Sequence, residues 1–136
     1  MTTELTTAAG TDRRATLSGR NKAGLALATL LGIADLASLA GPQPAPGEQG
    51  PPTAVLVAST VLGLITVVAA VYTWRTGNRV GSRVVAGSRI LSAVGSLPAF
   101  FVAGVPAGLV AVAAAGVVVT VLSVWLVLSP PRGRAV

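Results

Sequence analysis

The feature that most constrains this fold is a stretch of forty residues, 90–129, without a single charged side chain. As one continuous helix it would be about 60 Å long, about twice the thickness of the hydrocarbon core of a membrane. The stretch must therefore turn, and the segment GVPAG at 104–108 supplies the glycines and proline that turns favour. We predict two helices, at about 86–104 and 107–129, that pair as a hairpin.

Two further apolar blocks precede the hairpin, at 23–40 and 53–74. Each is about the length that crosses a membrane as a helix. Between them, segment 41–52 contains five prolines and three glycines, so it is expected to be a loop. Charged residues make up 10% of the chain, against roughly 25% in ordinary soluble domains, which leaves too little polar material to cover a soluble surface.

The basic residues fall only before the first block, around the segment between the second and third blocks, and after the fourth. They are Arg13, Arg14, Arg20 and Lys22, then Arg75, Arg79, Arg83 and Arg89, then Arg132 and Arg134. Four spans place these three segments on one side of the membrane, and the positive-inside rule makes that side the cytoplasm. A rival interpretation, a cleaved signal peptide over 1–40, fits poorly with so long an apolar stretch and with Asp35 inside it.

We therefore predict an all-α, polytopic protein of the cell inner (plasma) membrane, folded as a compact four-transmembrane-helix bundle with both termini in the cytoplasm. The predicted parts are a flexible cytoplasmic tail at 1–20, a transmembrane domain at 21–129 with an extracytoplasmic loop at 41–52 and a basic cytoplasmic loop at 75–85, and a cytoplasmic tail at 130–136.

Small and weakly polar residues recur at helical spacing in each predicted span. They are Gly24, Ala28, Gly32, Asp35 and Ser38; Ser59, Gly63, Thr66, Ala70 and Thr73; Ser88, Ser92, Gly95, Ser96, Ala99 and Ala103; and Ala113, Gly116, Thr120 and Ser123. Steps of three and four keep each set on one helix face. Because membrane helices associate through close packing of small residues, we expect these faces to meet and the larger apolar residues to contact lipid.

Asp35 is an acid within the first apolar block, roughly 8 Å along the helix from its outer end. The second block runs in the opposite direction, so its residues at this depth should be Ser59 and Thr60. A protonated Asp35, or one hydrogen-bonded to these hydroxyls or to that of Ser38, is tolerable at this depth, whereas a charged, unpaired acid in hydrocarbon costs a few kcal/mol. Arg89 is placed at the cytoplasmic end, out of reach. Two roles stay open for Asp35: a proton- or cation-exchanging site, or a polar residue that joins helices.

The four arginines around the middle loop, Arg75, Arg79, Arg83 and Arg89, are candidates for contact with anionic lipid or a partner, beyond their role in setting topology. The chain contains no Cys and no His, and only four acids. No carboxylate pair, Ser-His constellation, phosphate loop or metal cluster can be recognised, so we expect neither an enzyme nor a bound metal or cofactor. Because the basic residues fall between apolar blocks, lipid headgroups are a better expected partner than nucleic acid.

The motif GIADL in the first block, the Pro-rich loop and LPAFFVAGVPAG at 97–108 resemble the small four-helix membrane proteins of actinobacteria. That resemblance covers residues 23–129 and implies no known activity. A second resemblance is to the small multidrug resistance carriers, which have four short helices and an essential acid in the first. Asp35 matches that position, although it is Asp instead of Glu, lacks aromatic neighbours, and sits in a chain of strong charge asymmetry.

These observations favour a non-catalytic membrane protein that acts by association with lipid, with itself or with a larger membrane complex. The alternative is a small proton-coupled carrier that uses Asp35.

Overall fold

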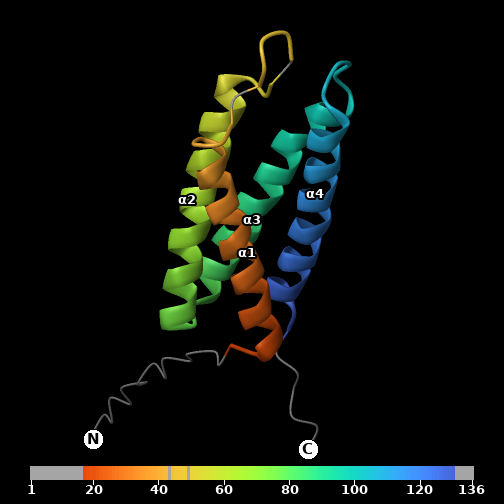
Figure 1. Ribbon diagram of the computed structural model, residues 1–136. Coiled ribbons are helices and arrows are strands. Elements are labelled where there is room, and N and C mark those ends of the chain that lie inside the picture. The colour runs from red at the N-terminus through yellow and green to blue at the C-terminus, as the bar shows by residue number, and fades with distance from the viewer. Residues whose placement is uncertain (1–16, 43, 49, 131–136) are drawn as a thin grey trace, which may run out of the picture.

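The computed structural model describes residues 17–42, 44–48 and 50–130, and this part of the chain is entirely helical apart from turns and loops (Figure 1). The helices are α1 (Gly19–Ser38), α2 (Thr53–Thr76), α3 (Arg79–Ser96), the short 3-10 helix η1 (Leu97–Phe100) and α4 (Ala107–Leu128). The prediction of an all-α fold with four main helices is confirmed. Of the predicted tails, 1–20 and 130–136, residues 1–16 and 131–136 lie outside the described residues, and α1 already begins at Gly19.

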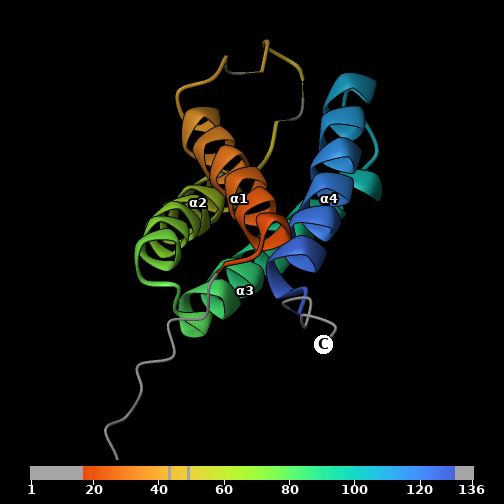
Figure 2. The same cartoon turned by 90° about the horizontal axis from the view of Figure 1, so that it is seen from below.

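Each main helix packs against the next one in the chain, and α1 also packs against α4, so that the four form a closed ring. Figures 1 and 2 show this arrangement from the side and from below. The described chain begins and ends at the same end of the bundle (Figure 1), which also holds the α2–α3 turn. We call this end the base. The Pro-rich loop and the α3–α4 connection lie at the opposite end, the loop end.

The base is built by local capping. Ser18 and Asn21 form a capping box at the start of α1, in which the Ser18 side chain accepts the Asn21 backbone N–H. Between α2 and α3 the chain turns within two residues: Gly77 ends α2 with φ 67°, and the Asn78 side chain caps α3 by accepting the Val80 N–H. A glycine suits this left-handed position because it has no Cβ to clash.

This tight turn corrects the predicted loop at 75–85, which is helical apart from the turn. Helix α3 begins at Arg79 instead of residue 86, because the small and polar residues of this segment continue the helix once Asn78 caps it. Helix α3 also ends earlier than predicted, at Ser96, and η1 follows with Pro98 in its first turn. Proline lacks the N–H that an α-helix needs, so the α-helix ends before Pro98. The hairpin turn before α4 is confirmed, with Gly104 at φ 91° and α4 beginning after Pro106.

The interior confirms most of the predicted small-residue faces. Gly24, Ala28 and Gly32 of α1 are buried, as are most of the predicted residues of α2 and the base half of α4. A Cβ at Gly24 would lie 2.7 Å from the Val127 backbone nitrogen, and one at Gly32 would lie 2.9 Å from the Gly63 carbonyl oxygen. These helices touch so closely that no larger residue fits. Gly95 is exposed with open space around it, so the predicted face of α3 does not extend to its end.

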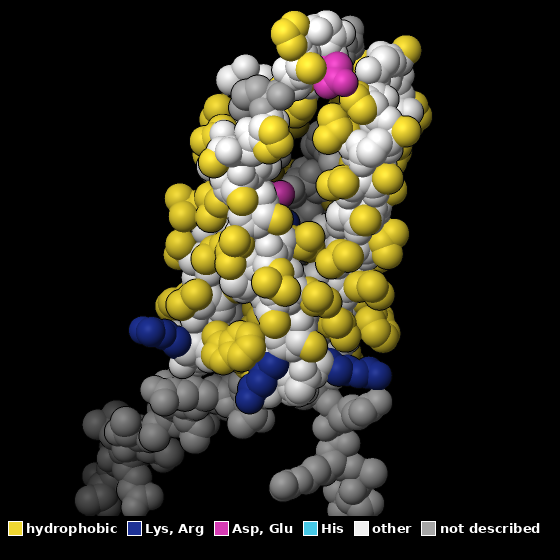
Figure 3. Space-filling view, in the orientation of Figure 1, with side chains coloured by type: hydrophobic (Ala, Val, Ile, Leu, Met, Phe, Trp, Pro, Cys, Tyr) yellow, Lys and Arg dark blue, Asp and Glu magenta, His cyan; other side chains and the backbone are white. Residues whose placement is uncertain are grey.

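Large apolar side chains cover the outside of the bundle. Leu25, Val85 and Val127 are the larger members of the buried apolar core, whereas many Leu, Ile, Val and Trp side chains on the four main helices are at least 40% exposed. By length and composition alone, α2 and α4 could each cross a membrane, which weakly suggests membrane association. Figure 3 shows hydrophobic side chains over the length of one face, with Lys and Arg gathered at the base.

Candidate functional site

The most unusual interior group is an ion pair between α1 and α3. The Arg89 Nη2 donates to Asp35 Oδ2 at 2.5 Å, and the side chains are 2% and 24% exposed, respectively. Arg89 lies ten residues after Arg79, the first residue of α3, and thus about 15 Å along the helix. The assignment of Arg89 to the cytoplasmic end was therefore wrong: it reaches the depth of Asp35 because α3 begins earlier than predicted.

Hydroxyl groups from α2 and α3 complete this site. The Arg89 Nε donates to Thr66 Oγ1 at 3.1 Å, and Thr66 Oγ1 lies 2.7 Å from Ser88 Oγ. Ser92 Oγ lies 3.4 Å from Asp35 Oδ2, a weak hydrogen bond. We call Asp35, Arg89, Thr66, Ser88 and Ser92 the ion-pair cluster. It links three of the four helices through side chains alone.

The hydroxyls predicted to hold Asp35 do not do so. Ser38 donates to the backbone carbonyl of Asp35 at 2.6 Å, and Thr60 donates to the Leu56 carbonyl at 2.9 Å. Ser59 is half-buried and makes no side-chain hydrogen bond to Asp35 in the described part of the chain. The neighbour of Asp35 on α2 is instead Gly63, where an added Cβ would lie 2.8 Å from Asp35 Cβ. Counting from the span ends placed Asp35 beside Ser59. The observed pairing of α1 with α2 differs from that prediction by about one helical turn.

Pairing explains how these charges can be inside the bundle. An isolated buried charge is costly, whereas an ion pair with additional hydrogen bonds offsets much of the desolvation. Arg89 suits this place because its guanidinium can donate to the carboxylate and to Thr66 at once. Asp35 is less enclosed than Arg89, and Figure 3 shows an acidic side chain recessed in a hollow between helices. The site can thus join helices, and its carboxylate can also be reached by a small solute or a proton.

The remaining predicted arginines lie at the base. Arg75, Arg79 and Arg83 are exposed there, on the last turn of α2 and the first turns of α3. They stay candidates for contact with anionic lipid or a partner. Arg89 does not belong to this group, because it is buried and paired with Asp35.

Sequence reasoning missed Asn21 as an interhelical residue. Its side-chain amide is buried and donates to three carbonyls at the end of α4: Leu126 at 3.1 Å, Val127 at 2.9 Å and Ser129 at 3.2 Å. These are carbonyls that a helix end leaves without partners. Ser123 adds a further link, donating to the Gly24 carbonyl at 3.0 Å. The base is therefore fastened by polar contacts between α1 and α4.

Among the described residues no group of three or more His, Cys, Asp or Glu side chains could hold a metal ion. Comparison of the chain with protein-family models, with curated proteins and with solved structures gives no match.

Proposed function

We propose that this chain is a four-span membrane protein with both termini in the cytoplasm, and that it acts without catalysis, by associating with lipid, with itself or with a larger membrane complex. The observation that carries this proposal is the distribution of side chains. Small and hydroxyl-bearing residues fill the interior, while large apolar ones face outward on every main helix. A surface of this kind is unfavourable in water and favourable in lipid.

The ion-pair cluster supports the non-catalytic role. Arg89 is tied at once to the carboxylate of α1 and the hydroxyl of α2, so the pair acts as an interhelical fastener. Close backbone contacts at Gly24, Gly32 and Gly63 leave no cavity between those helices at these points. Polar contacts of this kind are a usual way to join membrane helices.

A second candidate, a small proton-coupled carrier, is favoured by one observation. The Asp35 side chain keeps 24% exposure although its partner is almost fully buried. Protonation of that carboxyl would remove the charge that holds Arg89, and acids inside membrane spans often serve proton relays. We rank this role second because the pair must separate in every cycle.

Topology can be tested by cysteine labelling, since the natural chain has no Cys. Glu48→Cys, in the Pro-rich loop, should react with a membrane-impermeant maleimide on intact cells. Arg83→Cys, at the base, should react only after the membrane is opened, and the parent chain should never react. Labelling of both variants on intact cells, or of Arg83→Cys alone, would refute the proposed topology.

The two roles differ in proton movement. Purified protein in vesicles containing a pH-sensitive dye should, for a non-catalytic bundle, acidify no faster than empty vesicles under an imposed proton gradient. Acidification by the wild type that Asp35→Asn abolishes and Ser92→Ala retains would overturn the association role in favour of the carrier.

A further inference from the structure

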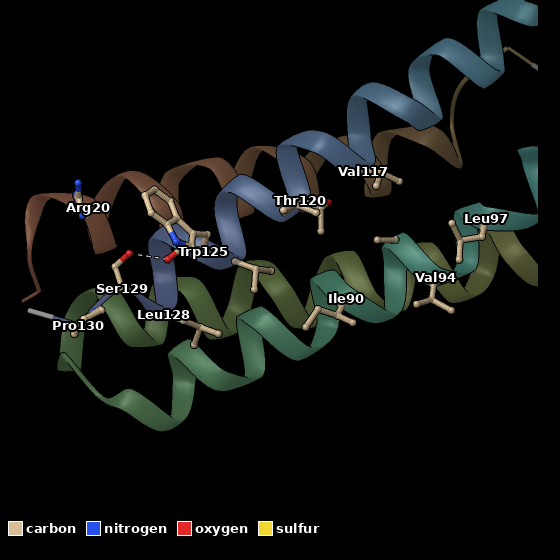
Figure 4. A pocket seen from close by; sticks show the side chains of 13 residues that line it. Arg20, Ile90, Val94, Leu97, Val117, Thr120, Trp125, Leu128, Ser129 and Pro130 are labelled. Carbon is tan, nitrogen blue, oxygen red and sulfur yellow. Dashed lines mark hydrogen bonds between the residues drawn. The ribbon is translucent and has the colours of Figure 1, made fainter.

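A second feature of the bundle is an apolar groove on its outer surface between α3 and α4, with a volume of about 710 Å³. Figure 4 shows it running from Arg20, Trp125 and Ser129 at the base to Leu97 and Val117. We call it the α3–α4 groove. Its apolar walls are made by Ile90 and Val94 of α3, by Leu97 of η1, and by Val117, Val121 and Trp125 of α4.

The length of the groove limits what can fill it. From Val117 to Ser129 it follows α4 for about 18 Å, close to the roughly 15 Å of one leaflet's hydrocarbon. A spanning helix from another copy would have to cover about 30 Å. The groove therefore fits an acyl chain that enters from one membrane surface and ends near the midplane.

The base end of the groove carries positive charge. The Arg20 guanidinium lies 5.5 Å from the centre of the Trp125 ring, within the range of a cation–π contact. Ser129 lines the same end. In the described part of the chain both acids lie elsewhere, Asp35 in the ion-pair cluster and Glu48 in the Pro-rich loop. Charge complementarity thus favours an anionic headgroup at this end. Trp side chains are enriched at membrane–water interfaces, where lipid headgroups lie.

We propose that the α3–α4 groove binds one anionic phospholipid, with one of its two acyl chains along Val94 and Val121 and its phosphate at Arg20. This inference rests on the proposed membrane location and deepens the proposed association by naming its ligand. One basic residue near a membrane surface raises the affinity for anionic lipid by about fivefold. Neutralising Arg20 would therefore lower the preference for anionic over zwitterionic phospholipid by about that factor.

The test uses full-length protein purified in mild detergent, incubated with equal amounts of phosphatidylglycerol and phosphatidylcholine, and examined by native mass spectrometry. Val121→Trp places a large ring in the groove. Val118→Trp is its matched control, because Val118 and Val121 are 59% and 61% exposed on the same helix and Val118 does not line the groove. Arg20→Gln tests the headgroup contact. Thermal unfolding of each variant establishes that it is folded.

We expect wild type and Val118→Trp to retain phosphatidylglycerol in preference to phosphatidylcholine. Folded Val121→Trp should lose the retained lipid, and Arg20→Gln should keep lipid but lose the preference. Equal retention of both lipids by wild type, or equal loss in the two Trp variants, would overturn the proposal. So would a wild-type dimer that only Val121→Trp dissociates, because a second copy would then occupy the groove. The cysteine labelling above tests membrane insertion separately. If the protein is inserted but binds no lipid, the proposed lipid site is refuted and the proposed membrane topology is not.

Discussion

Breaking the ion pair from the Asp35 side should be the most damaging single change in the interior. In Asp35→Leu the Arg89 side chain, 2% exposed, keeps its hydrogen bond to Thr66 but loses its counter-charge. Removing one partner of a buried pair costs about 3–5 kcal/mol of stability. We expect about 3 kcal/mol, the low end of that range, because the 24% exposure of Asp35 already lessens the strength of the pair.

Removing the other partner should cost less. In Arg89→Met the carboxylate that remains is 24% exposed and can be solvated by water, so we expect a loss of about 1–2 kcal/mol. The double variant Asp35→Leu/Arg89→Met leaves no buried charge, and it should lie within about 1 kcal/mol of wild type. Additive effects would instead give a loss of about 4–5 kcal/mol.

The assay is equilibrium unfolding in mixed detergent micelles, followed by circular dichroism, with Ser92→Ala as control. That control loses only the weak 3.4 Å bond to Asp35 and should change stability by less than about 0.5 kcal/mol. Asp35→Leu as stable as wild type, or a double variant as unstable as the sum of the single ones, would refute the account of the pair as an interhelical fastener.

Two further contacts predict measurable losses in the same unfolding assay. Gly63→Ala should destabilise by about 1–3 kcal/mol, because its Cβ would lie 2.8 Å from both Asp35 Cβ and the Gly32 carbonyl oxygen. Gly95→Ala, with open space around it, should be neutral or stabilising by up to about 1 kcal/mol, and an equal loss in both variants would contradict the close-packing argument. Asn21→Ala should lose about 1–3 kcal/mol of stability, because it removes the amide that donates hydrogen bonds to the carbonyls at the end of α4. Lys22→Ala, at an exposed neighbouring position, is the control. Equal losses in the two variants would show that the Asn21 hydrogen bonds contribute little to stability.

Periodicity was enough to predict the packing faces of α1 and α2. Steps of three and four between small residues fix which side of a helix can approach a neighbour, whatever the depth of the helix in the bundle. Gly24, Gly32, Gly63 and Thr66 are accordingly all buried. The hairpin before α4 was also predictable, because Gly104 and Pro106 restrict the backbone locally.

The ion pair was not predicted, because it depends on where helices begin and how they slide past each other. Counting from the ends of apolar blocks placed Asp35 beside Ser59, yet its α2 neighbour is Gly63. The same counting treated Arg89 as the end of a loop, whereas the cap at Asn78 starts α3 far enough back to carry Arg89 inward. One signal was present in the sequence: an acid and a base each adjoin long apolar runs, and charges inside a membrane usually pair.

In the proposed membrane protein, large apolar side chains face lipid while small and hydroxyl-bearing residues face each other. Spin labels at Val61→Cys and Val118→Cys, in protein reconstituted in phospholipid vesicles, test it most directly, with the buried Ser123→Cys as comparison. The first two labels should collide readily with dissolved oxygen and hardly with a water-soluble nickel complex, and the label at Ser123→Cys should collide with neither. Ready collision of the Val61 and Val118 labels with nickel would place that surface in water and contradict the account.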